Sequence, residues 1–165
     1  MKLIDSLVRE LTHETRTTRR HLERLPDDKL GWKPHAKSYT AGALACHLID
    51  CIRWTQPLFT RDGFDVDPST FDCCQAASVA DLLATFDADV ARCGGVLAAV
   101  AEEDLTKPWR LGVKGRQLFE RPKGDVFRDF VLSHLIHHRG QLTVYLRLLD
   151  VPLAGTYGPT ADEPF

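Results

Sequence analysis

Four long segments of this chain carry apolar residues at intervals of three and four, the spacing that lines one face of an α-helix. Pro26 ends the first segment and Pro152 follows the last, because proline cannot continue a helix. The segments span about residues 3–25, 40–59, 78–100 and 125–150. Four amphipathic helices and little else predict an all-α fold, an antiparallel four-helix bundle.

Residues that favour helix starts precede two of these segments. Ser38 or Thr40 is the expected N-cap of the second helix, and Ser78 with Asp81 forms a variant of the capping box at the third. Between the third and fourth helices, residues 109–119 contain two glycines. This segment is compatible with a short hairpin or with an irregular excursion, and the sequence leaves both open.

Length and charge narrow the class of protein. A chain of 165 residues with 44% hydrophobic and 27% charged residues predicts one globular domain, residues 1–165. The formal net charge is −2, and no run of Lys and Arg is dense enough to neutralise many phosphates. We therefore expect a small-molecule substrate and no nucleic-acid partner.

The sequence also predicts a location. No segment approaches the ~20 apolar residues that cross a bilayer, and charges occur too early at the N-terminus for a secretory signal. The five cysteines are odd in number and form no C-x-x-C, so a disulfide framework is not expected. These features predict a cytoplasmic protein without a membrane partner.

The stretch SHLIHHRGQ, residues 133–141, places three histidines within five positions. At about 100° per residue, His134 and His138 lie ~40° apart, inside a core stripe that we centre near His138, whereas His137 lies at its margin. Side chains four apart on one helix face are neighbours, so two imidazoles can converge on one metal ion. Gln141 borders this face. Arg139 points away from it and is expected to form a salt bridge between helices.

A third imidazole comes from the second helix, where His47 is expected in the middle of the buried stripe. A buried imidazole without a partner costs on the order of 1–3 kcal/mol, so a shared metal ion explains three such residues. The alternative is a polar core network with His137 at the surface. His21 is the strongest substitute ligand, Cys51 is a possible additional one, and Asp50 is a candidate for orienting an imidazole.

The sequence resembles the DinB/YfiT-like superfamily, described as metalloenzymes, over nearly its whole length. The most specific element is H-x-x-x-H-R-G-Q, from His134 to Gln141, together with a single histidine on the second helix. The helix ending L-x-x-L-P, followed by W-K-P, adds support. The segments that carry the resemblance are LERLPDDKLGWKPHAKSYTAGALACHLIDCIRW (22–54), SHLIHHRGQLTVYLRLLDVP (133–152) and YGPTADE (157–163).

The resemblance implies that His47, His134 and His138 hold one divalent transition metal ion, with Zn or Ni favoured. It also implies a left-handed four-helix bundle, open coordination positions and a homodimer. Members of the superfamily include thiol transferases and isomerases, and others are tied to stress responses. The favoured interpretation is therefore a metal-dependent thiol S-transferase that uses a low-molecular-weight thiol as cosubstrate on an electrophile.

Two other functions stay open. One is a metal-dependent hydrolase in which metal-bound hydroxide is the nucleophile, although no acid/base partner is identified in the sequence. The other is a non-enzymatic metal-binding stress-response protein, whose site would be closed to substrate. The catalytic residues, the metal, the thiol and the electrophile are not fixed by the sequence, because imidazole suits Zn, Ni, Cu and Fe alike.

Overall fold

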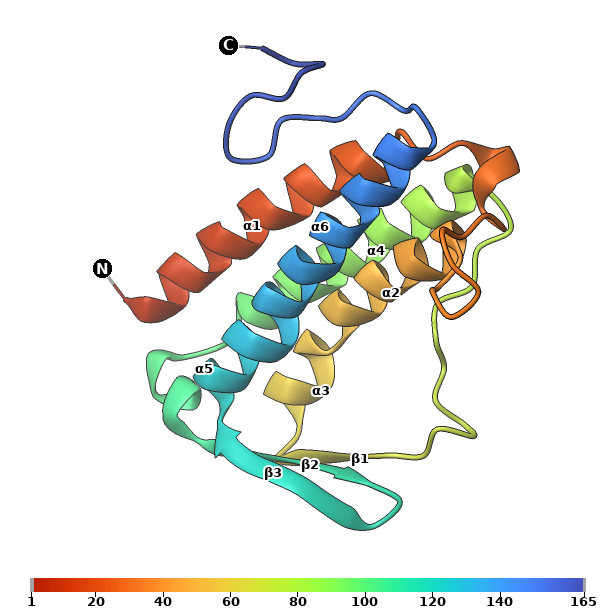
Figure 1. Ribbon diagram of the computed structural model, residues 1–165. Coiled ribbons are helices and arrows are strands. Elements are labelled where there is room, and N and C mark those ends of the chain that lie inside the picture. The colour runs from red at the N-terminus through yellow and green to blue at the C-terminus, as the bar shows by residue number, and fades with distance from the viewer. Residues whose placement is uncertain (1, 165) are drawn as a thin grey trace.

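Four helices form the bundle in the computed structural model, which describes residues 2–164. Helix α1 packs against α4 and α6, and α2 packs against the same two helices. The bounds are α1 (Leu3–Leu22), α2 (Ala41–Arg53), α4 (Val79–Leu97) and α6 (His134–Leu148) (Figure 1). The predicted helical bundle is thus confirmed. The first and third helices begin and end within a few residues of their expected bounds, whereas the second and fourth differ more.

The helices do not alternate in direction. Helices α1 and α6 run one way, and α2 and α4 run the other (Figure 1). The pairs α1/α2 and α4/α6 are therefore antiparallel, as expected, whereas α2 and α4 are parallel. The cause is the connection over residues 61–78, which returns along the length of the bundle before α4 begins.

A small sheet corrects the all-α prediction. Strand β1 (Gly63–Val66) pairs in parallel with β2 (Pro108–Val113), and β2 pairs antiparallel with β3 (Arg116–Pro122). The β2–β3 turn has positive φ at Lys114 (50°) and Gly115 (78°), as the twist of a two-residue hairpin requires. The hairpin alternative for residues 109–119 is confirmed. Strand β1 was missed because it has only four residues and pairs with a distant segment.

The second predicted helix is two helices. Helix α2 begins after Thr40, whose hydroxyl accepts from the Ala43 N–H (3.1 Å), and ends at Arg53. The short α3 (Thr55–Thr60) then turns away. Pro57 accounts for the break, because its ring clashes with the carbonyl of the residue four positions earlier. The third helix begins as expected, with the Ser78 hydroxyl accepting from the Asp81 N–H.

The fourth predicted helix contains an irregularity. Helix α5 (Lys123–Val126) continues into a π-helix, Phe127–Ser133, before α6 begins at His134. A π-helix adds residues to each turn, so side chains before it are rotated relative to those after it. The core stripe expected near His138 is therefore displaced around α6. The buried side of α6 is formed by Leu135, Arg139, Leu142, Tyr145 and Leu146.

The core lies between the four bundle helices and extends to the inner face of the sheet. Phe86 of α4, Phe127 and Trp109 of β2 are its largest fully buried apolar side chains. Two short 3₁₀ helices, Asp27–Lys29 and Glu102–Thr106, join the larger elements. Within residues 2–164, no helix is long and apolar enough to cross a membrane.

A buried ion pair joins α1 to α6. The Arg139 guanidinium, 2% exposed, donates to Glu14 Oε2 (2.5 Å) and to the Tyr157 hydroxyl (2.7 Å). The Tyr157 hydroxyl in turn bonds the Glu14 carboxylate (3.0 Å). The predicted interhelical salt bridge of Arg139 is confirmed. The network also fixes the C-terminal segment, where Glu163 pairs with Arg20.

Candidate metal centre

The three predicted histidines meet between α2 and α6. The His47 ring lies 5.0 Å from the His134 ring and 4.4 Å from the His138 ring, measured between centroids. The rings of His134 and His138 are 4.7 Å apart. Helix α2 packs directly on α6, and the i, i+4 spacing on α6 places two imidazoles one above the other. The structure thus brings together the side chains that the sequence selected.

Two of these imidazoles are spaced as ligands of one ion would be. Nε2 of His47 lies 3.2 Å from Nε2 of His134. A tetrahedral site with bonds of ~2.0–2.1 Å places its nitrogens about 3.3 Å apart. A hydrogen bond with the Phe130 backbone engages the His134 ring as well. Because Nε2 faces His47, we assign that bond to Nδ1, which leaves Nε2 as the ligand atom.

The site lies at the edge of the core and not at its centre. His47, His134 and His138 are all half-buried, which corrects the expectation that His47 occupies the middle of a buried stripe. The π-helix explains why His134 and His138 of α6 also lie at the edge of the core. Two cavities of about 390 Å³ border the cluster, one lined by His138 and the other by His47. Tyr39 lines both cavities and stands 5.8 Å from the His47 ring.

Cys51 competes with His138 as the third ligand. Ligand atoms of His47, Cys51 and His134 all lie within 4.8 Å of one another, the one such group of His, Cys, Asp and Glu side chains found in residues 2–164. The Cys51 thiol is 1% exposed, and burial raises its pKa to about 12. A thiol becomes a strong ligand only after it loses its proton. Cys51 can therefore bind a metal ion only if that ion promotes the deprotonation of the thiol.

Gln141 fixes the orientation of His138. The Gln141 Oε1 atom accepts from Nδ1 of His138 (2.8 Å), so the proton sits on Nδ1 and the lone pair on Nε2. The Gln141 amide nitrogen donates to Nε2 of the exposed His137 (3.0 Å). The prediction that Gln141 borders the site is confirmed. His137 contacts the cluster through this amide and through its ring, which lies 4.9 Å from the His138 ring.

All three imidazoles are held in their neutral form. Burial, followed by the proximity of His138 and His134, lowers the pKa of His47 to about 4. Burial also lowers the pKa of His134 and of His138, although a hydrogen bond to each ring opposes the shift. Neutral imidazole is the form that binds a metal, so the cluster is ready to accept a cation at neutral pH.

Replacing Gln141 with leucine is expected to weaken metal binding about 10- to 100-fold, because His138 loses the acceptor that sets its tautomer. A competition assay with a chromogenic chelator measures the change. Gln117→Leu, on the exposed face of β3, is the matched control and is expected to leave the affinity unchanged. Equal affinities of the Gln141→Leu and Gln117→Leu proteins would remove Gln141 from the site.

The other candidate residues lie outside the cluster. His21 is fully buried, its Nδ1 bonds the Thr17 carbonyl (3.0 Å), and it is not part of the His47, Cys51 and His134 group found in residues 2–164. His13 stacks on Tyr157, and His35 accepts from a loop N–H. Asp50 does not orient an imidazole. Its carboxylate instead accepts from the Cys74 N–H and pairs with Arg53.

The buried His21 imidazole predicts a loss of stability in acid. Burial lowers its pKa below the unfolded value of about 6.5. The unfolded chain therefore binds more protons as the pH falls below about 6.5, so the stabilising contribution present above that pH is progressively lost. We expect urea midpoints of metal-free protein to fall from pH 7 to pH 5, and less steeply in His21→Gln. Equal pH slopes in the two proteins would contradict this assignment.

Comparisons with known proteins identify the family of this chain. The DinB superfamily profile matches residues 10–142, a range that includes His47, His134 and His138. The chain belongs to the DinB superfamily. The family resemblance drawn from the sequence is thus confirmed. The chain is also 26% identical over 164 residues to the uncharacterized protein YrdA of Bacillus subtilis, covering 97% of this chain and 91% of YrdA.

Solved structures of DinB-like proteins share the fold. One, from Bacillus cereus ATCC 10987, superposes with a TM-score of 0.73 at 22% identity and covers 93% of this chain and 97% of that one. Another, YjoA of Bacillus subtilis, has a TM-score of 0.69 at 18% identity, with 97% and 96% coverage. These superpositions establish the arrangement of helices in this DinB-superfamily member.

Proposed function

We propose that this DinB-superfamily protein is a metal-dependent thiol S-transferase, with one divalent ion held by His47, His134 and His138. The observation that carries the proposal is the convergence of three neutral imidazoles at a half-buried position between α2 and α6. Zinc and nickel both suit three imidazole ligands. A bound cation lowers the pKa of a thiol or water that binds it, and so supplies a nucleophile at neutral pH.

The surroundings of the cluster favour a reaction with two substrates. One bordering cavity reaches His138 and Gln141, and the other reaches His47, with Tyr39 between them. Separate cavities on either side of the cluster give room for a low-molecular-weight thiol and an electrophile at the same time. A hydrogen bond to α6 fixes the backbone of Tyr39, because its carbonyl accepts from the Tyr145 hydroxyl (3.1 Å). We assign to its ring the task of separating the two substrates.

The same features bear on the alternatives. A stress-response protein that only holds a metal would have a closed site, whereas these imidazoles are half-exposed and border two cavities. A hydrolase needs an acid/base group near the nucleophile. The exposed His137, whose ring contacts that of His138 (4.9 Å) and which is hydrogen-bonded to Gln141, keeps that candidate open. Assembly as a homodimer and a cytoplasmic location remain part of the proposal.

Turnover assays distinguish these functions. Protein loaded with Zn²⁺ or Ni²⁺ is expected to speed the reaction of 1-chloro-2,4-dinitrobenzene with at least one of glutathione, cysteine and coenzyme A, at least tenfold over metal-free protein. His134→Ala is expected to lose this acceleration. Hydrolysis of a nitrophenyl ester without any thiol turnover would support the hydrolase instead. Metal binding with neither activity would support the non-enzymatic protein.

A further inference from the structure

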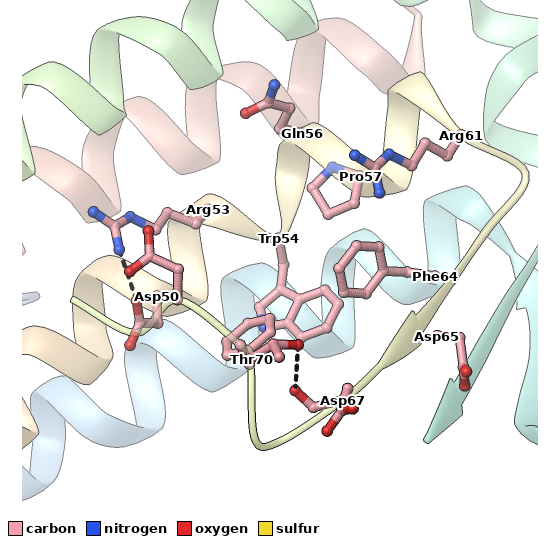
Figure 2. Close-up of a pocket in the computed structure, with 12 residues that line it drawn as sticks. Asp50, Arg53, Trp54, Gln56, Pro57, Arg61, Phe64, Asp65, Asp67 and Thr70 are labelled. Atoms are coloured by element: carbon pink, nitrogen blue, oxygen red, sulfur yellow. Dashed lines mark hydrogen bonds and ion pairs between the residues drawn. The ribbon is translucent and has the colours of Figure 1, made fainter. Parts of the chain in front are cut away.

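A third cavity, of about 360 Å³, lies beside α3 and the sheet, toward the sheet end of the bundle. Figure 2 shows Trp54 at its middle, with Phe64 beside it and Pro57 and Arg61 along one edge. Phe130 separates this cavity from the imidazole cluster, because its ring contacts both Trp54 (5.5 Å) and His134 (5.8 Å). The proposed metal chemistry assigns no role to this cavity.

The walls of the cavity are aromatic. The Phe71 ring stacks on Trp54 at a centroid distance of 5.7 Å, and the Phe64 ring meets Trp54 edge-on at 5.6 Å. These three side chains are only half-buried, so part of each ring faces the cavity. Partly exposed rings gathered around one space gain most from a flat aromatic group, which buries apolar area and adds ring contacts.

Most charged groups around the cavity already have partners. Arg53 is paired with Asp50 (3.2 Å) and Asp89 (2.8 Å). The Asp65 carboxylate accepts from the Gly115 N–H (2.9 Å), and the Asp67 carboxylate accepts from the N–H and the hydroxyl of Ser69. The carboxylates of Asp65 and Asp67 thus accept hydrogen bonds from the loops that form the cavity. Asp72 is exposed to solvent, which screens its charge.

Arg61 is the exception. Its guanidinium stands 5.2 Å from the centroid of the Phe64 ring, and among residues 2–164 it has no carboxylate within ion-pairing distance. A guanidinium offers five N–H donors in a plane that matches a carboxylate. The Phe64 ring, over which the Arg61 guanidinium lies, also forms a wall of the cavity. Arg61 is itself solvent-exposed, so the cavity presents aromatic surface next to one exposed cation with free donors.

We propose that this cavity binds a small aromatic carboxylic acid. The aromatic ring of the ligand lies against Trp54 and Phe64, and its carboxylate accepts hydrogen bonds from Arg61. A neutral amide of the same shape keeps the ring contacts but loses the charge-assisted bonds. An amine of the same size places its charge against the guanidinium.

Calorimetry with three matched probes tests the proposal. The acid 3-phenylpropionate is expected to bind with a Kd of about 1 mM or below. We expect 3-phenylpropanamide to bind at least tenfold more weakly, and 2-phenylethylamine more weakly still. Arg61→Gln is expected to make acid and amide bind equally, whereas Arg116→Gln, at the hairpin end of β3, preserves the preference. Phe71→Leu is expected to weaken all three probes.

The acid is also tested on protein with and without metal, because a carboxylate can bind a metal ion directly. The acid is expected to bind equally well to metal-stripped and Zn²⁺-loaded protein, so a failure of the proposed transferase activity leaves this result intact. Any of three results would overturn the proposal. They are tighter binding of the amine than of the acid, an acid preference that survives Arg61→Gln, and no acid binding without metal.

Discussion

Replacing His138 with alanine is expected to abolish stoichiometric binding of a divalent ion, as is replacing His47 or His134. Each change removes one of three neutral imidazoles whose rings lie within 5.0 Å of one another. Two remaining imidazoles form a weak, exchangeable site. The bundle is expected to stay folded, because its apolar core does not depend on these half-buried rings. Metal analysis after gel filtration, alongside far-UV circular dichroism, measures both effects.

Two controls locate the site. His137→Ala is expected to leave metal occupancy nearly unchanged, because the His137 ring is exposed and touches the cluster only from outside. Cys51→Ala is also expected to keep the metal. Loss of the metal in His137→Ala with retention in His138→Ala would make the assignment on α6 wrong. Retention in His138→Ala with loss in Cys51→Ala would exchange the third ligand for the thiol.

Replacing Glu14 with glutamine is expected to destabilise the protein by roughly 3 kcal/mol, because it leaves the Arg139 cation buried without its counter-ion. The guanidinium is 2% exposed and lies 2.5 Å from the carboxylate. For a chain of this length, the melting temperature is expected to fall by about 6–12 °C. Urea denaturation gives the free energy of unfolding directly.

Glu10→Gln is the matched control on the same helix. Glu10 pairs with Arg128 at 3.4 Å in a solvent-exposed ion pair, so the expected change is at most about 0.5 kcal/mol. Equal destabilisation by the two substitutions would mean that the Glu14–Arg139 pair contributes no more than a surface contact.

The sequence was sufficient to predict the helices and the histidine cluster because both depend on local spacing. Apolar intervals fixed α1, α2, α4 and α6, and the four-residue step from His134 to His138 fixed their shared face. The interhelical salt bridge of Arg139 was predicted, but its position on the buried side of α6 was not, because it was expected to point away from the core stripe. Helical spacing could not place Tyr39 beside His47, because Tyr39 lies in the loop before α2.

The features that were missed depend on distant contacts or on irregular backbone. Strand β1 forms because it pairs with the edge of β2, which is distant in the sequence. A segment of four residues carries no pattern that predicts this pairing. The π-helix at Phe127–Ser133 has no reliable sequence signal, yet it rotates α6 and moves the histidines from the core to its margin.

X-ray absorption spectroscopy on Zn²⁺-loaded protein tests the central claim most directly, because nitrogen and sulfur ligands lie at different distances from zinc. Coordination by His47, His134 and His138 predicts a first shell of nitrogen and oxygen atoms alone at ~2.0–2.1 Å, with the multiple-scattering pattern of three imidazoles. A sulfur atom at ~2.3 Å, lost in the Cys51→Ala protein, would show instead that the metal is held by His47, Cys51 and His134.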